Sequence, residues 1–437
     1  MSLKINDKQL PEGWVEQKLA DLIGISHGYA FKGCDFNRSD DLEKPIVLTP
    51  GNYSENGELY FTAQNTKRLV GKVPPDGYFF DVGDLTVVMT DLSSKMKILG
   101  KPAFINHPNI LHNQRIGRIL FQDESINPKY LYYFLQTKTV ADKVKETATG
   151  TMVRHTAPKR ILNITIPIPL LPEQKQIVSI VDQAFEGIDR AIANTKKNLT
   201  NARELFESHL NEIFTQKGDG WIEKKLGDIA AFRNGLNFTK NSKGESIRIV
   251  GVKDFQNNFW IQEDQLESVT LDGELKEIDA LRKGDILTVR SNGNRELIGR
   301  CVLVGDLSER TSHSGFTIRL RIEREDIHLP FIVHFLKSRE LRKQLTESGG
   351  GINISSLNQQ GLSLITVSFP SFIEQNNIVA SIDELAIVTQ RLEAIYRQKL
   401  AALNELKQSI LQKAFTGELT ADTANQTTKK AEEAIAA

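Results

Sequence analysis

Length, composition and charge narrow the classes of protein to which this chain can belong. It has 437 residues, more than one hydrophobic core usually organises, so we expect two to four domains. Its 55 basic and 55 acidic residues cancel, and 40% hydrophobic with 25% charged residues is typical of a globular protein. We find no secretory signal and no run of roughly 20 apolar residues. Because Cys34 and Cys301 are the only cysteines, we predict a reduced, cytoplasmic protein without disulfides, a metal site or a membrane contact.

Charge is unevenly distributed along the second half of the chain. Residues 233–253 hold five basic residues and one acid, residues 254–279 hold eight acids and one lysine, and residues 282–324 hold nine basic residues and five acids. A local basic patch can bind phosphate even when the net charge is zero. The alternation is compatible with one basic and one acidic face, and an ordinary mixed surface explains it equally well.

Short β-rich runs and helices alternate along the chain. In the first half of the chain we predict strands at 85–90, 102–105 and 116–121, then an amphipathic helix at 129–146 and a long helix over 177–213. The second half repeats this order, with strands at 285–289, 301–304 and 317–322, a helix at 330–347 and a long helix over 378–410. Turn sequences such as Asn56-Gly57 and Asn292-Gly293 separate the strands. This pattern predicts an α+β fold.

The sequence contains an internal duplication. Residues 13–22 return as 220–229 at an offset of 207, and from Gly83-Asp84 onward the offset becomes 201. At that offset Glu173-Gln174 falls on Glu374-Gln375, and His112 falls on His313. Such a period is far too long for a solenoid, whose units span about 20–50 residues. The repeat therefore predicts a duplicated pair of domains with an internal pseudo-two-fold axis.

The two long helices carry apolar or small residues mostly three or four positions apart, as in a coiled coil. These residues are Ile177, Val181, Ala184, Ile188, Ile192, Leu199, Ala202, Phe206 and Ile213 in the first helix, and Ile378, Ile382, Leu385, Val388, Leu392, Ile395, Leu403, Leu406 and Ile410 in the second. Pro172 and a Ser371-to-Glu374 capping box predict the helix starts, and Gly218 and Gly417 the ends. We expect antiparallel helices about 60 Å long that bury these stripes against each other, the alternative being that each packs only on its own globule.

Two similar globules joined by a rigid pair of helices suit a bipartite DNA target, since dimeric readers address half-sites about 34 Å apart. Three segments resemble motifs of the specificity subunit of type I restriction–modification enzymes. They are the start of a repeat at 220–229 (Gly-Trp-Ile-Glu-Lys-Lys-Leu-Gly-Asp-Ile), the strand and arginine loop at 284–291, and the proline-rich entry to a spacer helix at 166–174. The resemblance covers about residues 11–420. The first copy departs from it, with Met89-Thr90-Asp91-Leu92-Ser93 where an arginine loop is expected, and 369–375 holds fewer prolines.

This resemblance implies a fold of two similar mixed α/β target-recognition globules joined by two long antiparallel helices. We expect target-recognition domains at 1–160 and 219–361, helical spacers at 161–218 and 362–418, and a tail at 419–437. The implied function is recognition of an asymmetric, bipartite site in double-stranded DNA, with no chemistry of its own. Two methyltransferase subunits and restriction subunits would be the partners. They would carry S-adenosylmethionine, ATP and Mg²⁺, whereas this chain would hold no cofactor.

Candidate DNA contacts lie in two segments of each copy, because arginine and asparagine side chains read bases while lysine mostly meets phosphate. The first segment follows a predicted strand, and the second precedes each long helix, where glycines allow the backbone close to phosphate. The candidates are Ser93, Ser94, Lys95, Lys97, Lys101, Arg154, Lys159 and Arg160 in the first copy, and Arg290, Asn292, Asn294, Arg295, Arg300, Gly350 and Asn353 in the second. A solvated turn, a strand-end cation and a plain hinge are the respective alternatives.

Catalytic patterns are missing from the sequence. The matched His112 and His313 have no recurring carboxylate or nucleophile beside them, so we favour structural histidines over catalytic ones. No phosphate-binding Gly-x-x-x-x-Gly-Lys-Ser/Thr loop and no Asp/Asn-Pro-Pro-aromatic methyltransferase motif occurs. Two rival hypotheses remain at this point: a duplicated-domain enzyme with a site between its globules, and a coiled-coil scaffold that binds no DNA.

Overall fold

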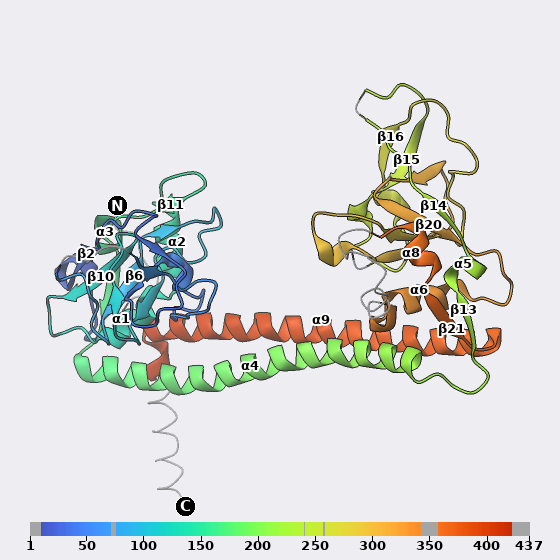
Figure 1. Ribbon diagram of the computed structural model, residues 1–437. Coiled ribbons are helices and arrows are strands. Elements are labelled where there is room, and N and C mark those ends of the chain that lie inside the picture. Colours follow the sequence, from blue (N-terminus) through green and yellow to red (C-terminus); the bar gives the residue numbers. More distant parts are fainter. Residues whose placement is uncertain (1–9, 71–75, 240, 257, 342–356, 422–437) are drawn as a thin grey trace, which may run out of the picture. The chain divides into compact units, whose positions relative to one another are not determined.

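The computed structural model describes residues 10–70, 76–239, 241–256, 258–341 and 357–421 (Figure 1). The chain forms two compact units. Unit 1 comprises residues 1–195 and 399–437, and unit 2 comprises residues 196–398. Each unit therefore contains one copy of the repeated globule together with a part of both long helices.

Unit 1 contains a four-stranded antiparallel sheet in the order β2-β10-β6-β8 and a second sheet of short strands in the order β3-β5-β4-β9. Two further pairs, β1-β12 and β7-β11, complete it. The strands are β1 (Val15–Lys18), β2 (Ile23–His27), β3 (Phe36–Asn37), β4 (Ile46–Val47), β5 (Arg68–Leu69), β6 (Leu85–Val88), β7 (Thr90–Asp91), β8 (Pro102–Phe104), β9 (Ile110–Leu111), β10 (Ile116–Phe121), β11 (Arg154–His155) and β12 (Thr165–Ile168). Its short helices are α1 (Pro128–Leu135), α2 (Lys138–Glu146) and α3 (Pro158–Leu162).

Unit 2 repeats this plan with the sheet β14-β20-β17-β18, the sheet β16-β15-β19 and the pair β13-β21. The strands are β13 (Ile222–Lys225), β14 (Ala231–Asn234), β15 (Ser246–Val250), β16 (Glu267–Thr270), β17 (Ile286–Val289), β18 (Cys301–Leu303), β19 (Thr311–His313), β20 (Thr317–Arg321) and β21 (Thr366–Phe369). Its short helices are α5 (Leu226–Ile229), α6 (Leu329–Lys337) and α8 (Gln359–Ser363). The duplication predicted from the sequence is thus confirmed in the fold.

The registers of the two central sheets match residue by residue. In unit 1 Ile116 pairs with Val88, and in unit 2 Thr317 pairs with Val289, which are the same positions 201 residues later. All six strands predicted from the sequence exist, with ends within two residues of the expected ones. The strands β6 and β17 are fully buried, which explains their unbroken apolar or β-branched composition.

The helix predicted over residues 129–146 is wrong in one respect, because the segment forms two helices, α1 and α2. The break falls at Gln136 and Thr137. The buried hydroxyl of Thr137 donates to Phe134 O at 2.7 Å and accepts from Val140 N at 3.3 Å, so it ends one helix and caps the next. In unit 2 the single helix predicted over 330–347 is wrong in the same way, because α6 ends at Lys337 and the backbone is extended at Ser338; the part from residue 342 onward lies outside the described residues.

The long helices are α4 (Leu171–Thr215) and α9 (Phe372–Thr416). They are antiparallel within each unit. In unit 1 Lys407 binds Asp189 at 2.5 Å, and Thr420, further along the chain, binds Glu173 at 3.0 Å. In unit 2 the ends of both helices join one core, which includes Phe214 of α4. The alternative in which each helix packs only on its own globule is therefore wrong.

The apolar seam predicted for α9 is partly wrong. Val388, Ile395 and Leu406 are 46%, 50% and 47% exposed, whereas Thr389 is buried. Helix α9 carries apolar residues on more than one side, so their spacing did not by itself identify the buried stripe. The seam predicted for α4 is confirmed at Ile177, Val181, Ile188, Ile192 and Ala202, all of which are buried.

The repeated Glu-Gln dipeptide marks the junction of each globule with its long helix. The fully buried Gln174 donates to Ser125 O and Pro169 O at 2.8 and 2.9 Å and accepts from Asn127 N at 2.8 Å. Gln375 makes the three equivalent bonds in unit 2, at 2.9 Å each. One amide side chain therefore satisfies three main-chain groups and sets how the long helix leaves the globule.

Candidate nucleic-acid interface

The first candidate segment of unit 1 begins where strands β6 and β7 end. The carboxylate of Asp91, which is 3% exposed, accepts from Ser93 N at 2.8 Å and from Ile98 N at 3.0 Å. Both ends of the loop are thereby tied to one buried side chain. The candidates Ser93, Ser94 and Lys95 lie on the loop between these ties and are exposed.

Strand pairing brings the second candidate segment to the first. Strand β11 pairs with β7, so that Arg154 lies opposite Asp91 and His155 opposite Thr90. The side chains of Thr90 and His155 are 3.0 Å apart. The turn before β11 projects from the unit beside its label in Figure 1, and Met152 on it is 80% exposed. Residues about 60 positions apart in the sequence therefore form one candidate surface in unit 1.

The turn depends on a glycine. Gly150 has a φ of +92°, and a Cβ built there would lie 2.0 Å from the carbonyl oxygen of Val153. No side chain fits this position, so the geometry of the turn itself requires glycine. This steric requirement explains the glycine without the close approach to phosphate that the sequence suggested. Main-chain bonds between Thr149 and His155, at 2.9 and 3.0 Å, close the base of the turn.

The basic side chains predicted to contact DNA in unit 1 differ in their exposure and in whether the protein itself already binds them. Lys159 is exposed, whereas Lys97 is paired with Glu55 at 2.6 Å. Burial, together with the nearby Lys145, lowers the pKa of Lys101. Arg160 is half-buried and donates to Thr149 Oγ1 at 3.4 Å, so it also supports the turn.

In unit 2 the loop after β17 is tied by two asparagines and not by one buried carboxylate. Asn292, the counterpart of Asp91, accepts from Asn294 N at 2.8 Å, and Asn294 accepts from Glu296 N at 3.1 Å. Arg290 is half-buried, and its carbonyl oxygen accepts from Leu357 N at 2.8 Å. The equivalent bond of unit 1 joins Thr156 N to Met89 O at 3.0 Å. Sequence reasoning missed the anchoring residue Asp91, although its offset of 201 from Asn292 would have identified it.

Arg300, which was predicted to meet a phosphate, is engaged by the protein's own main chain. Its guanidinium donates to Gln256 O at 2.8 Å and to Glu296 O at 3.3 Å. Three other candidates of the second copy, the side chain of Arg295 and residues Gly350 and Asn353, lie outside the described residues.

The matched histidines are buried and neutral. His112 donates from Nε2 to Ile116 O at 2.8 Å, and burial lowers its pKa to about 4. His313 lies with Nδ1 2.9 Å from the hydroxyl oxygen of Thr317, and burial lowers its pKa to about 3. Neither imidazole is bonded to a carboxylate of the part of the chain that the structure describes, which fits the structural interpretation. Within the ranges that the structure describes, no group of three or more His, Cys, Asp or Glu side chains could hold a metal ion.

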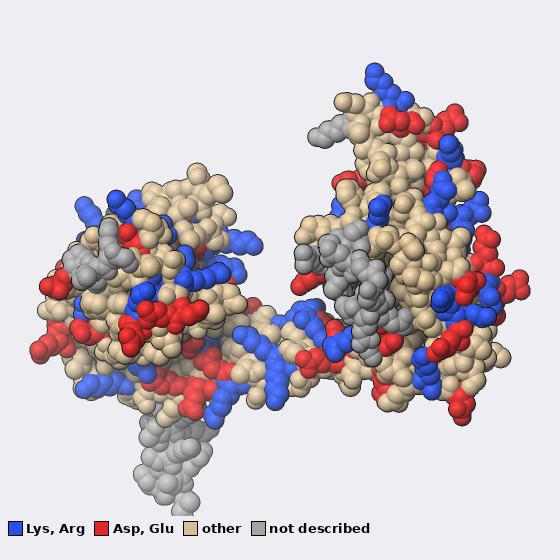
Figure 2. Space-filling model, in the orientation of Figure 1, with Lys and Arg blue, Asp and Glu red and all other residues tan. Residues whose placement is uncertain are grey.

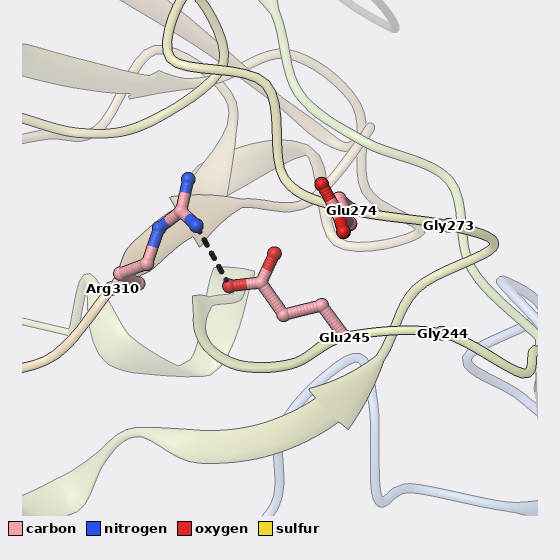
Figure 3. Close-up of a pocket in the computed structure, with 5 residues that line it drawn as sticks. All are labelled: Gly244, Glu245, Gly273, Glu274 and Arg310. Atoms are coloured by element: carbon pink, nitrogen blue, oxygen red, sulfur yellow. Dashed lines mark ion pairs between the residues drawn. The ribbon is translucent and has the colours of Figure 1, made fainter.

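Unit 2 also carries a shallow hollow of about 490 Å³ away from these loops (Figure 3). Gly244, Glu245, Gly273, Glu274 and Arg310 line it. Arg310 forms ion pairs with Glu245 at 3.2 Å and with Glu277 at 3.1 Å. Because the guanidinium of Arg310 is already paired with carboxylates, this hollow is poorly suited to bind a phosphate.

Basic and acidic side chains are interspersed over both units on the face drawn in Figure 2. On that face the alternating charge of the sequence therefore gives a mixed surface and no segregated basic face. None of the helices in the described ranges is long and apolar enough to cross a membrane.

Comparison with known proteins identifies the family. The model of the type I restriction modification DNA specificity domain matches residues 11–201 and again residues 218–402. The chain belongs to this family. The two matches coincide with the two copies of the internal repeat, so each copy is one specificity domain.

Complete relatives are similar over nearly their whole length. The StySPI specificity subunit of Salmonella potsdam is 26% identical, with 95% of this chain and 91% of the relative covered. The EcoKI specificity subunit of Escherichia coli K12 is also 26% identical, with 94% and 90% covered. Both are specificity subunits of type I restriction enzymes.

Solved structures share the fold. A chain from a study of complex assembly and conformational transition in a type I restriction–modification system has a TM-score of 0.70 at 17% identity, covering 93% of this chain and 99% of that one. The HsdS subunit of Thermoanaerobacter tengcongensis has a TM-score of 0.53 at 16% identity, covering 95% and 99%. The predicted α+β fold with two similar globules and two long helices is thus confirmed.

Proposed function

We propose that this specificity-domain protein directs a type I restriction–modification complex to an asymmetric, bipartite DNA site, with one half-site read by each unit. The observation that carries the proposal is the pair of loops after β6 and β17. Both are tied by an acceptor side chain at the same repeat position, Asp91 and Asn292, yet they present different polar groups. Two similar platforms with different side chains suit two different half-sites.

The chemistry would be carried by other subunits. Two methyltransferase subunits and restriction subunits would bind this chain and would hold S-adenosylmethionine, ATP and Mg²⁺. Support for a protein partner comes from α9 within unit 2, where Ile387, Val388 and Ile395 are 60%, 46% and 50% exposed. Exposed apolar residues clustered on one helix are typical of a protein-binding surface.

Mapping N6-methyladenine across the genome, in cells with and without this gene, tests the proposal. We expect one bipartite, asymmetric motif to lose its methylation when the gene is deleted. The purified chain with its partner methyltransferase should also bind a duplex carrying that motif, and the affinity should fall steeply with salt. No change in any motif, together with no salt-dependent binding of duplex DNA, would contradict the proposal and favour a scaffold that binds no DNA.

A further inference from the structure

The loop that follows strand β17 in unit 2 has an arginine at its start, and the corresponding loop of unit 1 has none. In unit 2 the pairing of β17 with β20 continues one residue beyond Val289 and Thr317, since Arg290 N donates to Phe316 O at 2.8 Å. Arg290 and Phe316 are therefore neighbours across the two strands. Phe316 is 61% exposed.

In unit 1 the arginine and the apolar residue have exchanged places between these two positions. Met89 replaces Arg290 and is 2% exposed, and its N–H donates at 2.9 Å to the carbonyl oxygen of Arg115, which replaces Phe316. Both replacements lie 201 residues before their counterparts. The arginine that unit 1 lacks on one strand therefore lies on the neighbouring strand, next to the same main-chain position.

The turn that carries Arg115 is held in the same way in both units. Ile116 N donates to Asn113 O at 2.9 Å, and Thr317 N donates to Ser314 O at 2.9 Å. In addition, Asn113 Oδ1 accepts from Arg115 N at 2.9 Å. The main chain at Arg115 is thus fixed by hydrogen bonds on both sides.

The side chain of Arg115 has no structural task among the described residues. It is exposed and makes no hydrogen bond or ion pair there. Arg118, three residues further along β10, pairs with Asp81 at 2.9 Å and with Asp84 at 2.8 Å. An unpaired guanidinium on a fixed main chain, beside the candidate loops of unit 1, is suited to bind an external partner.

We propose that Arg115 is a specificity-determining residue that contacts a guanine in the half-site read by unit 1, in the role expected of Arg290 in unit 2. This inference rests on the proposed function. Guanine offers two acceptors, N7 and O6, in the major groove, and the planar guanidinium binds both at once. Lysine provides the charge without this two-pronged geometry.

The test uses the full chain with its partner methyltransferase and compares Arg115→Ala, Arg115→Lys and the wild type. Duplexes carrying the mapped motif, and variants altered at each position of one half-site, are the probes. We expect Arg115→Ala to weaken binding of the cognate duplex about 5- to 150-fold and to relax discrimination at one guanine of a single half-site. Arg115→Lys should remain weakened at that base pair. Arg38→Ala, which removes another exposed arginine of unit 1 together with its hydrogen bond to Gln64 O at 3.0 Å, is the control and should change neither half-site.

Each contrary result has its own meaning. Unchanged specificity in Arg115→Ala, with the wild-type melting temperature, would overturn the inference while the proposed function stands. Full rescue by lysine, or equal weakening on unrelated sequences, would make Arg115 a phosphate contact and overturn the guanine assignment. A wild-type map without any bipartite motif would instead overturn the proposed function itself.

Discussion

Units 1 and 2 build the same loop platform with different side chains. In both, a buried strand is followed by a loop in which one polar side chain accepts from the main-chain N–H two residues later: Asp91 accepts from Ser93 N, and Asn292 accepts from Asn294 N. The loop of unit 1 is two residues longer, since Gly100 and Gly299 make the same bond to strands β6 and β17 at an offset of only 199. The scaffold is thus separate from the residues it presents, which allows the side chains and loop length to change without disturbing the sheet.

The junctions between globule and helix also differ in one pair of residues. In unit 1 Tyr133 binds Asp182 through its hydroxyl group, and Lys129 pairs with the same carboxylate at 2.7 Å. In unit 2 the equivalent pair is His334 and Asp383, 3.5 Å apart, which is too long for a good hydrogen bond. Burial dominates at His334 and lowers its pKa to about 4. Unit 2 therefore carries an acid-sensitive group where unit 1 has a phenol.

The largest expected effect comes from the feature that the units share. Gln174→Ala should lower the free energy of unfolding of unit 1 by about 3 kcal/mol, because two carbonyl groups and one N–H lose their buried partner. Gln375→Ala should do the same to unit 2. Hydrogen exchange, followed separately for the peptides of each unit, measures both. Lys175→Ala, at the exposed neighbouring position, serves as the control, and an effect of Gln174→Ala that spreads equally over both units would contradict this prediction.

The next effect should separate the units in DNA binding. Arg290→Ala should weaken recognition of the half-site read by unit 2 by about 1–3 kcal/mol and leave the other half-site unchanged. Competition binding with duplexes altered in one half-site at a time measures this. If binding to unrelated sequences falls by the same factor, Arg290 contacts phosphate and not a base.

Acidification should destabilise unit 2 more than unit 1. Burial lowers the pKa of His313, His328 and His334 in unit 2, but only of His112 in unit 1; the pKa falls to about 3 at His313 and to about 4 at His334 and His112. Each imidazole is neutral in the folded state and takes up a proton when unfolded below the usual pKa of about 6.5. Its contribution to stability is complete above pH 6.5 and is lost as the pH falls toward the folded pKa.

Between pH 7 and pH 5 His112, His313 and His334 should each cost about 2 kcal/mol, so unit 2, which also contains His328, should lose at least about 2 kcal/mol more than unit 1. Limited proteolysis at stepped pH, with cleavage sites mapped to each unit, checks the order. The variant His334→Tyr, which copies unit 1, should reduce the difference. Equal losses in both units would refute the assignment.

The smallest effect should come from exchanging the two loop anchors. Asp91→Asn keeps one oxygen to accept from Ser93 N, so only the bond to Ile98 N is weakened, at a cost of about 1 kcal/mol. We expect a slightly reduced affinity for the half-site read by unit 1 and a melting temperature lowered by about 2–4 °C. Asp91→Ala, which removes both bonds, should have a clearly larger effect on the same half-site. Similar behaviour of the two variants would show that Asp91 does not position the loop.

The amino-acid sequence by itself determined the duplication, the six strands and the two long helices. These follow from local patterns and from the offsets between the copies, and buried strands such as β6 and β17 consist of apolar or β-branched residues throughout. The sequence also predicted that the loops after these strands differ between the copies.

Only the tertiary structure decided which distant residues meet. The pairing of β11 with β7, the three bonds of Gln174 and the position of Arg115 beside Met89 all depend on strand register and helix packing between segments far apart in the chain. The same holds for the exposed side of α9, where Val388 and Ile395 have the spacing of core residues but are exposed, with no partner among the described residues of unit 2 to cover them. Periodicity shows that a side chain is apolar at a regular interval, whereas its burial depends on which other segment packs against it.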